Sequence, residues 1–459
     1  MCRVFRVGAM LLFAAIAAGQ DTRKVTEPRI PPLCRSLDAE LSSAGEAIAD
    51  ADEIKLDTAR IQQAINQCRP GTAVELHAQG TRNAFLSAPL ELRRGITLLV
   101  SRGATLFASR NPRDYDITPG TCGTVDNSGI GCRPLISVQV HDAAVMGDGV
   151  IDGRGGAKLI GQDISWWDLA EQAKTHRVKI EVPGHNAPHI LVGEKADGLV
   201  LYRVTLRNSP HFHAIVYRTD GFTVWGVKIN SPETARNTDG IDASSSRNVS
   251  ILYSYIHAGD DHVAIKARDS DPSTHITIAH NHFYTGHGMS IGSGIRGGVS
   301  DIEVRDLTIQ GALNGIHIKS NPNRGGLVRR VSYRNVCMQD VKQPIFMETT
   351  YRGRTAGTLI PQYQDIRLRD VRISGGGKIL LDGFDHAHPL HITLDGVLAA
   401  MVPPVEVHAG HARVATGPGE VSFAPAGDDV LITRVRGSRK VPPCDQHFVD
   451  FPSDAGALR

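Results

Sequence analysis

Long apolar runs are scarce in this sequence. The run at residues 7–18 is twelve residues long, short of the roughly 20 that a membrane-spanning helix needs. No later stretch is apolar enough to span a bilayer, so we expect a soluble mature protein with no membrane association. The formal net charge of +2 is too small to argue for nucleic acid. It does not argue against a polyanionic substrate, which needs only a local basic patch.

Paired cysteines of the Cys-x-x-Cys type are absent, which argues against a zinc site and leaves disulfides as the expected use of cysteine. Cys2 lies in the N-terminal apolar segment, and six other cysteines remain. We predict that Cys122 pairs with Cys132 across a short Gly-rich loop. We also predict that Cys34 pairs with Cys68, and that Cys337 and Cys444 pair by subtraction.

The N-terminus has the pattern of a secretion signal. Arg3 and Arg6 precede the apolar run, and small residues at 15–19 offer a cleavage site near Gln20. We predict a signal peptide at 1–19 and export to the periplasm or out of the cell; an uncleaved anchor is the alternative. A loose leader at 20–33, a solenoid domain at 34–440 and a tail at 441–459 are expected to follow.

Helical periodicity is also scarce. Only residues 57–68 form a convincing amphipathic helix, with Asp57 as its N-cap and Ile61, Ala64 and Ile65 on one face. Pro70 and Gly71 should end it, and a strand is predicted at 73–76. A helix placed there would cap the first coil of a solenoid. In a later insertion, Trp166 or Trp167 could stack on a sugar ring, but simple packing is favoured.

What the chain has in quantity is glycine, at 47 residues, together with short strand-like runs that repeat. Similar units begin near residues 198, 221, 248, 275, 301 and 326, at spacings of 23, 27, 27, 26 and 25. Such periods indicate β-solenoid coils, and a β-sandwich would not give near-equal units. We therefore predict an all-β, right-handed parallel β-helix. Further strands are expected at 96–100, 104–107, 135–138, 144–145, 366–371, 379–381 and 390–394.

Polar clusters recur at the strands of four consecutive units. These clusters contain Asp239, then Asp260 and Asp261, then His287, and finally Lys319. Stacked parallel strands lie about 4.8 Å apart, so the clusters should meet along one line. Aspartate is common in turns, but four clusters in register favour a site over turn capping. Three close carboxylates must raise at least one pKa, which supplies the acid and the base of glycoside hydrolysis.

At these residues the sequence resembles the polygalacturonases, the family-28 glycoside hydrolases, and most closely the bacterial endo-acting members. The matching strings are Asn237-Thr238-Asp239, Gly259-Asp260-Asp261, Gly286-His287-Gly288 and Ile318-Lys319. The resemblance implies a single-stranded, pectin-lyase-like β-helix, no cofactor or metal, and de-esterified homogalacturonan as substrate. It implies that Asp260 is the general acid, that Asp239 and Asp261 activate water, and that His287 tunes the acid. Lys319 and Tyr351 would bind substrate, with Asn237 nearby.

One position departs from the family pattern of Arg-Ile-Lys, because His317 precedes Ile318 and Lys319. An arginine grips a carboxylate with two parallel bonds at any pH, whereas histidine is fully charged only when protonated. We hypothesise that activity survives with weaker substrate binding and a more acidic optimum. Arg236, Lys266 and Arg296 are candidate groove cations that would compensate, although each could equally be an ordinary solvated charge.

Other functions remain open at this point. A pectate lyase has a similar fold but would need Ca²⁺ and an arginine base. A rhamnogalacturonan or xylogalacturonan hydrolase is nearer, and exo-action depends on loops that the sequence does not resolve. A secreted pectin-binding solenoid without activity is the non-enzymatic alternative. Nothing in the sequence argues for an oligomer, so we expect a monomer.

Overall fold

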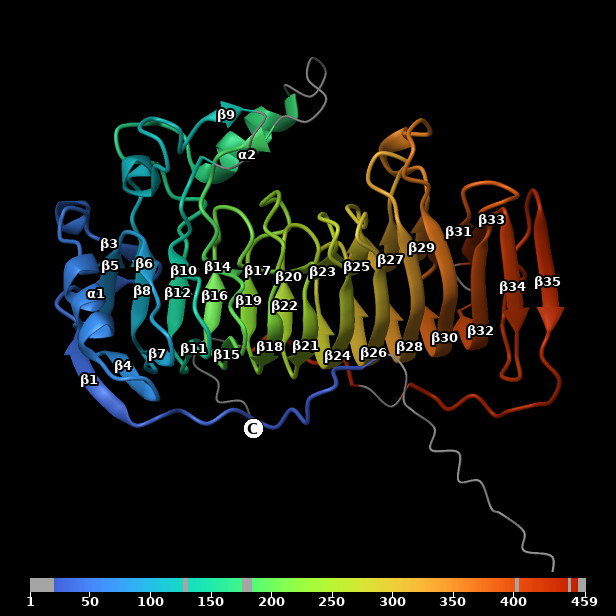
Figure 1. Cartoon of the computed structure of the whole chain (residues 1–459), viewed down its shortest axis with the longest axis horizontal. Helices are drawn as coiled ribbons and strands as arrows, with labels where there is room; N and C mark the ends of the chain where they lie inside the picture. Colours follow the sequence, from blue (N-terminus) through green and yellow to red (C-terminus); the bar gives the residue numbers. More distant parts are fainter. Residues whose placement is uncertain (1–19, 127–130, 176–183, 401–403, 445–446, 453–459) are drawn as a thin grey trace, which may run out of the picture.

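The chain winds into a long solenoid of parallel strands in the computed structural model, which describes residues 20–126, 131–175, 184–400, 404–444 and 447–452 (Figure 1). The predicted signal peptide at 1–19 lies outside the described residues, as do parts of the insertion and of the C-terminal tail. Two large parallel sheets run the length of the molecule. The predicted all-β, right-handed parallel β-helix is confirmed.

The larger sheet begins as two rows of short strands, which then merge into single long ones. The first row contains β1 (Leu33–Asp38), β4 (Thr72–His77), β7 (Ile96–Val100), β11 (Ala144–Met146), β15 (Val200–Tyr202), β18 (Asp220–Trp225) and β21 (Arg247–Leu252). The second contains β5 (Ala84–Ser87), β8 (Thr105–Ala108), β12 (Val150–Asp152), β16 (Thr205–Arg207), β19 (Lys228–Asn230) and β22 (Tyr255–His257). The merged part contains β24 (Ser273–Phe283), β26 (Val299–Gln310), β28 (Leu327–Gln339), β30 (Gln362–Ser374), β32 (Leu390–Ala399), β34 (Ala412–Thr416) and β35 (Val430–Arg434).

The second sheet has 11 strands and carries the motifs found in the sequence. In chain order its strands are β6 (Leu90–Glu91), β10 (Ile136–Val138), β14 (Leu191–Glu194), β17 (Ala214–Tyr217), β20 (Ile241–Ser244), β23 (Val263–Lys266), β25 (Met289–Gly292), β27 (Asn314–Lys319), β29 (Gln343–Glu348), β31 (Gly377–Asp382) and β33 (Val405–Gly410). Two short antiparallel pairs lie outside the coils: β2 (Ser43–Ala44) with β3 (Ala47–Ile48), and β9 (Val125–Asp126) with β13 (Gly184–His185). Short 3-10 helices among the described residues are η1 (Asp50–Asp52), η2 (Pro112–Tyr115) and η4 (Tyr351–Gly353).

The strand register confirms four of the five predicted unit spacings and corrects the last. Equivalent positions in successive coils are Val200, Thr223, Ser250, Thr277, Glu303 and Ser332. The last step, from Glu303 to Ser332, is 29 residues rather than 25. The error arose because β28 begins at Leu327, four residues before Val331, which is the partner of Ile302.

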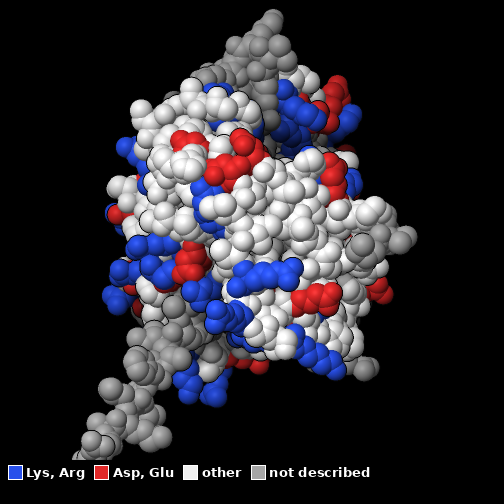
Figure 2. Space-filling view, turned by 90° about the vertical axis from the view of Figure 1, so that its right-hand side faces the viewer, with Lys and Arg blue, Asp and Glu red and all other residues white. Residues whose placement is uncertain are grey.

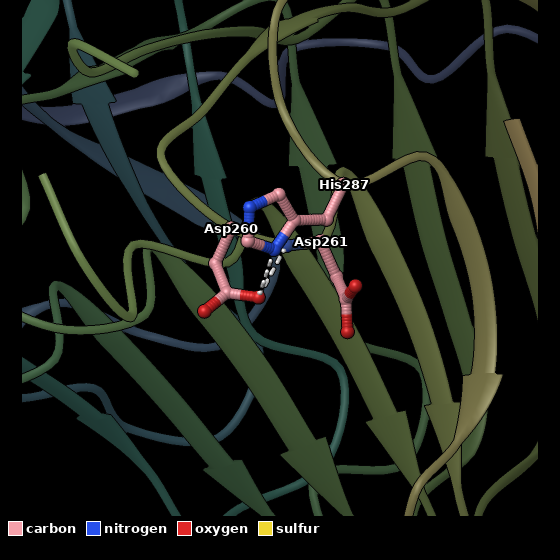
Figure 3. Close-up of side chains that lie close together, drawn as sticks. All are labelled: Asp260, Asp261 and His287. Carbon is pink, nitrogen blue, oxygen red and sulfur yellow. Dashed lines mark hydrogen bonds and ion pairs between the residues drawn. The ribbon is translucent and has the colours of Figure 1, made fainter. Parts of the chain in front are cut away.

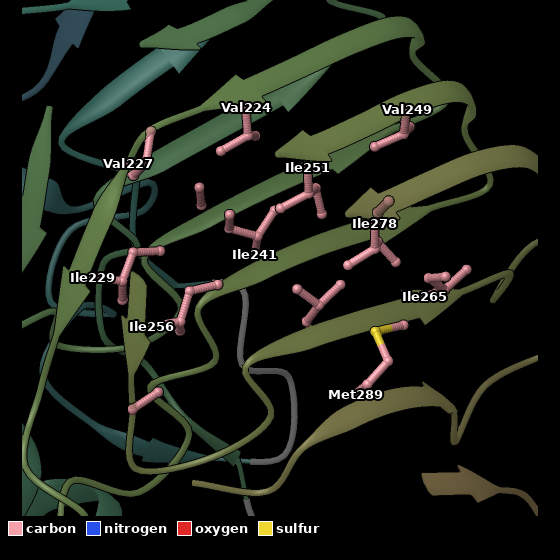
Figure 4. Packing of buried hydrophobic residues seen from close by; sticks show 14 of the residues in the cluster. Val224, Val227, Ile229, Ile241, Val249, Ile251, Ile256, Ile265, Ile278 and Met289 are labelled. Atoms are coloured by element: carbon pink, nitrogen blue, oxygen red, sulfur yellow. The ribbon is translucent and has the colours of Figure 1, made fainter. Parts of the chain in front are cut away.

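The interior of the coils is a continuous column of aliphatic side chains (Figure 4). Ile241, Ile265 and Met289 point inward from the 11-stranded sheet and meet Ile251 and Ile278 from the larger one, and all five are fully buried. Burying each such side chain contributes roughly 1.5–3 kcal/mol. Since strand residues alternate, this inward row places the residues between them on the outer face.

A stack of left-handed residues makes one corner of the solenoid. Tyr253, His280, Asp306, Asn335 and Asp370 have φ between 52 and 57° and occupy one register position in consecutive coils. Gly396 follows them with φ 76°. This conformation bends the chain sharply inside the larger sheet, and the sequence pattern did not indicate it because most of these residues are not glycine.

Helix α1 (Thr58–Gln67) caps the N-terminal end, as predicted, and buries Ile61, Ala64 and Ile65. Asp57 holds the N-cap position without a side-chain capping bond. Its carboxylate instead accepts from Leu86 N at 3.0 Å and pairs with Arg60. At the other end, β35 leaves Leu431 59% exposed, and Figure 2 shows this end as largely uncharged surface with basic side chains gathered toward the lower left.

The leader is not loose, contrary to the prediction. Residues 20–32 run along the larger sheet (Figure 1). Asp21 is buried there, where its amide donates to Thr277 Oγ1 at 2.9 Å and its carboxylate accepts from Ser250 Oγ at 2.7 Å. The described part of the tail also docks on the coils, since Tyr284 Oη donates to Val449 O at 3.0 Å.

A second helix, α2 (Trp166–Thr175), was not predicted. Trp166 is buried edge-on against Tyr115, with ring centroids 6.3 Å apart, and Trp167 Nε1 donates to Ser209 O at 2.9 Å. The packing interpretation of this insertion is therefore confirmed. Among the described residues, no helix has the length and apolar character needed to cross a membrane.

All three predicted cysteine pairs form disulfides. Their Cα–Cα distances are 5.9 Å for Cys34–Cys68, 4.8 Å for Cys122–Cys132 and 6.0 Å for Cys337–Cys444. The first ties β1 to the end of α1, and the last ties the tail to β28.

Candidate active site

The outer face of the 11-stranded sheet carries two rows of side chains in register. One row contains Asp242, Ala264, Ser290, His317 and Phe346. The other contains Ser244, Lys266, Gly292, Lys319 and Glu348. Polar side chains occupy this face because strand residues alternate, and their aliphatic neighbours fill the core. Two parts of the chain project on this side, α2 with β9 and the loop after β29 (Figure 1).

The loops that enter β20, β23 and β25 bring the predicted catalytic residues together. Asp239 precedes β20, Asp260 and Asp261 precede β23, and His287 precedes β25. Asp260, Asp261 and His287 each place one polar atom within 4.8 Å of the other two. The structure thus brings Asp260, Asp261 and His287 together, while the role of each predicted residue remains a proposal.

Asp260 faces His287 directly (Figure 3). His287 Nδ1 lies 3.0 Å from Asp260 Oδ1, which also accepts from Asp261 N at 3.0 Å. Asn237 Nδ2 lies 3.4 Å from the other carboxylate oxygen. Asp260 retains 22% side-chain exposure, against 4% for Asp261. Asp260 is therefore the carboxyl group that a bound ligand can reach most easily.

Asp261 is held from below by the outer rows. Lys319 Nζ donates to its two oxygens at 2.8 and 2.9 Å, and Ser290 Oγ donates at 2.7 Å. Both oxygens therefore accept hydrogen bonds, which fix the orientation of this carboxylate.

Asp239 lies in a separate buried ion cluster. Lys266 Nζ is 3.0 Å from Asp239 Oδ2 and also binds Asp242, a residue that sequence analysis missed. All three side chains are almost fully buried. The expectation that Lys266 is a groove cation is therefore wrong, because its ammonium group is buried and forms ion pairs with two carboxylates.

Burial and neighbouring charges shift the pKa values of Asp239 and Asp260 in opposite directions. The pKa of Asp239 lies well above its ordinary value, mainly because of burial and further because of Asp242, with Lys266 opposing. Burial also acts to raise the pKa of Asp260, but the hydrogen bond and charge of His287 outweigh it, so that this pKa is lowered. In return, Asp260 raises the pKa of His287 against the effect of burial. In the free protein the pair therefore carries its proton on His287.

His317 is buried on the outer face and cannot act as a cation at neutral pH. Burial, followed by the charge of Lys319, lowers its pKa. Its Nε2 lies 3.5 Å from Glu348 Oε1, and neither ring nitrogen has a hydrogen-bond partner among the described residues. The ring packs edge-on against Phe346, with centroids 5.9 Å apart.

The remaining predicted binding residues lie around this centre. The Tyr351 ring centroid is 5.6 Å from Lys319 Nζ, so Tyr351 lies at the site as predicted. Arg236 is half-buried on the side of His185, whose pKa it helps to lower after burial, and Arg296 is exposed. Neither forms an ion pair with the site carboxylates.

Several histidines near the site gave no recognisable sequence signal. His262 is fully buried beneath the Asp260 loop, and its Nδ1 accepts from Gly288 N at 2.9 Å. His185 stacks on His211 at 4.8 Å, and His189 meets His211 edge-on at 4.6 Å. Lone histidines at unequal spacings do not form a motif, so only folding brings them together.

Asp260, Asp261 and His287 are also close enough to hold a metal ion. Their donor atoms, however, already bind one another and Lys319. The arrangement is suited to proton transfer, because it combines an ion-paired carboxylate, a carboxyl group sharing a proton with imidazole, and a carboxyl group of raised pKa.

Comparisons with known proteins agree with this geometry. The family model for glycosyl hydrolases family 28 matches residues 103–401. An endo-polygalacturonase of Pectobacterium parmentieri is 41% identical over 85% of this chain and 92% of its own length. A polygalacturonase of Ralstonia solanacearum is 35% identical over 94% of this chain and 93% of its own.

A solved structure resembles the whole solenoid. The polygalacturonase from Erwinia carotovora matches with a TM-score of 0.75 and 36% identity, covering 92% of this chain and all of that one. Together with the sequence relatives, this match shows that the protein is a glycoside hydrolase belonging to glycosyl hydrolase family 28.

Proposed function

We propose that the protein is a polygalacturonase that hydrolyses α-1,4-galacturonosyl linkages of de-esterified homogalacturonan, with endo-action and inversion. The observation that carries this proposal is the cluster of Asp260, Asp261, His287 and Lys319 on one face, with Asp239 before the preceding strand. Relatives of the protein are named as an endo-polygalacturonase and a polygalacturonase. Export to the periplasm or out of the cell is part of the proposal, and the three disulfides fit an oxidising compartment. The monomeric state is also part of the proposal.

Asp260 donates the proton to the leaving oxygen. In the free protein that proton is on His287 Nδ1, 3.0 Å from Asp260 Oδ1. A bound polyanion adds negative charge and excludes water, and both effects raise the pKa of Asp260. The proton then moves to Asp260 and on to the glycosidic oxygen as the bond to the sugar carbon breaks.

Asp261 is the base. Lys319 and Ser290 hydrogen-bond to it and fix its orientation, so that it can accept a proton as water attacks the sugar carbon. Asp239, whose pKa is raised, hydrogen-bonds and orients that water. This division of roles refines the expectation that Asp239 and Asp261 act alike.

The test is incubation of the mature protein with polygalacturonate in the presence of EDTA, following reducing ends and the product anomer by NMR. Release of inverted oligogalacturonides, lost in Asp260→Asn, is the expected result. Unsaturated products would indicate elimination instead. No cleavage by a folded protein would contradict the proposal and direct attention to branched galacturonans.

A further inference from the structure

Three arginines follow strands of the 11-stranded sheet on one side of the proposed catalytic centre. Arg268 follows β23, Arg324 follows β27 and Arg352 lies in η4 after β29. Within the described part of the chain, none of the three has an ion-pair partner. Asp269, which follows Arg268 in the chain, pairs with Arg218 at 2.9 Å.

The first contact places Arg352 beside the site. The Arg352 guanidinium carbon is 5.2 Å from the centroid of the Tyr351 ring. Lys319 Nζ is 5.6 Å from the same centroid. The Tyr351 ring is therefore close both to the lysine that binds Asp261 and to the Arg352 guanidinium.

Arg324 is held close to the same tyrosine by the backbone. Its Nη1 donates to Ser293 Oγ at 2.9 Å, and its amide donates to Asn321 O at 2.9 Å. Asn321 Nδ2 in turn donates to Tyr351 O at 3.1 Å. These bonds order the half-buried Arg324 side chain, and no carboxylate of the described residues pairs with its guanidinium.

Arg268 lies against the next coil, because a Cβ built at Gly294 would be 2.9 Å from Arg268 Cγ. The three arginines act on one another. Burial, and then the charges of Arg352, Arg268 and Arg354, lower the pKa of Arg324. Like charges held together without anions repel, and such an arrangement is suited to an anionic ligand.

We propose that Arg268, Arg324 and Arg352 form a carboxylate clamp for galacturonate residues on the Lys319 side of the scissile bond. The inference rests on the proposed function. The clamp extends over three strand spacings, roughly 14 Å, which suits successive units of a polyanion. Guanidinium groups bind carboxylates with two parallel hydrogen bonds at any pH. The clamp thus supplies the positive charge that neutral His317 cannot, and it selects unesterified residues.

The test compares the double variant Arg324→Gln/Arg352→Gln with Arg329→Gln, an exposed arginine of β28 on the larger sheet. On polygalacturonate, the double variant should raise KM about tenfold with kcat within about twofold, because it removes binding common to ground and transition states. The ratio of kcat/KM on polygalacturonate to kcat/KM on the methyl-esterified polymer should be smaller for the double variant than for wild type. A KM or an ester preference equal to that of Arg329→Gln would overturn the clamp.

A binding measurement separates the clamp from the proposed reaction. In the Asp260→Asn background, calorimetry with an unesterified oligogalacturonide requires no cleavage. Affinity that falls in the double variant and not in Arg329→Gln supports the clamp even if the wild-type protein proves inactive. Equal affinity in all three proteins, or no binding by any of them, overturns it. Thermal unfolding and far-ultraviolet circular dichroism confirm that each variant is folded.

Discussion

Lys319 Nζ donates to both oxygens of Asp261, although 58 residues separate the two in sequence. Both side chains are buried, so removing one partner leaves an uncompensated charge. We expect Lys319→Met to lower the free energy of unfolding by about 3–5 kcal/mol, measured by urea denaturation. Lys342→Met, at an exposed position, should change it by less than about 0.5 kcal/mol. Equal effects would show that the pair is energetically unimportant.

Asp260→Asn removes the proposed acid while keeping its shape. We expect kcat on polygalacturonate to fall by about 10²–10⁴-fold, because a positioned acid contributes that much. Asp365→Asn, at an exposed position in β30, is the matched control and should retain full activity. Residual activity of Asp260→Asn within tenfold of wild type would place the acid elsewhere.

The pH profile should depend on His287. Its pKa is raised by Asp260, so the shared proton is present below that pKa and is lost as the pH rises through it. Activity should therefore decline on the alkaline side at this pKa. His287→Gln should lower kcat by about 10–100-fold and abolish that limb. An unchanged alkaline limb in the variant would exclude His287 as the proton source.

Asp239→Asn should separate stability from activity. Asp239 has a raised pKa, so between its unfolded and folded values the native state binds more protons, and stability falls as the pH rises. Asparagine removes this penalty, while Lys266 keeps Asp242 as its partner. At pH 7 we expect the Tm of the variant to equal or exceed that of wild type, and we expect this difference in Tm to shrink as the pH falls. We expect activity to fall by about 100-fold.

The matched comparison for stability is Asp220→Asn. Burial acts to raise the pKa of Asp220, but hydrogen bonds from Asn248 and Arg247 outweigh it, and the pKa is lowered. The charged form is therefore stabilised by folding, and Asp220→Asn should lower the Tm at pH 7. A Tm for Asp239→Asn that falls as much would contradict the raised pKa of Asp239.

His317→Arg should strengthen substrate binding. The new guanidinium would lie beside Glu348 and Lys319 and would remain charged at every working pH. We expect KM for polygalacturonate to fall several-fold, and we expect the activity of the variant to extend to higher pH than that of wild type. An unchanged KM and pH profile would show that this position does not contact the substrate carboxylates.

The repeat of strand-like runs predicted most of the coils, because each coil places aliphatic residues at the same inward-facing positions. Leu199, Phe222, Val249 and Ile276 each open a strand-like run at nearly equal spacing, and the structure pairs these runs in register. The rule failed where a strand lengthened, as in β28, and where non-glycine residues such as Tyr253 adopt positive φ. It also missed α2 and the docked leader, because their partners are distant in sequence.

The sequence by itself determined the solenoid and the approach of Asp260, Asp261, His287 and Lys319, because strand alternation and coil stacking are local rules that repeat. Only the tertiary structure decided how charge is distributed among them. Burial and neighbouring groups pair Lys266 with Asp239 and Asp242, lower the pKa of His317 and, within the described parts of the chain, leave Arg324 without a carboxylate partner. These outcomes depend on desolvation and on distances of a few ångströms, which no spacing of residues along the chain specifies.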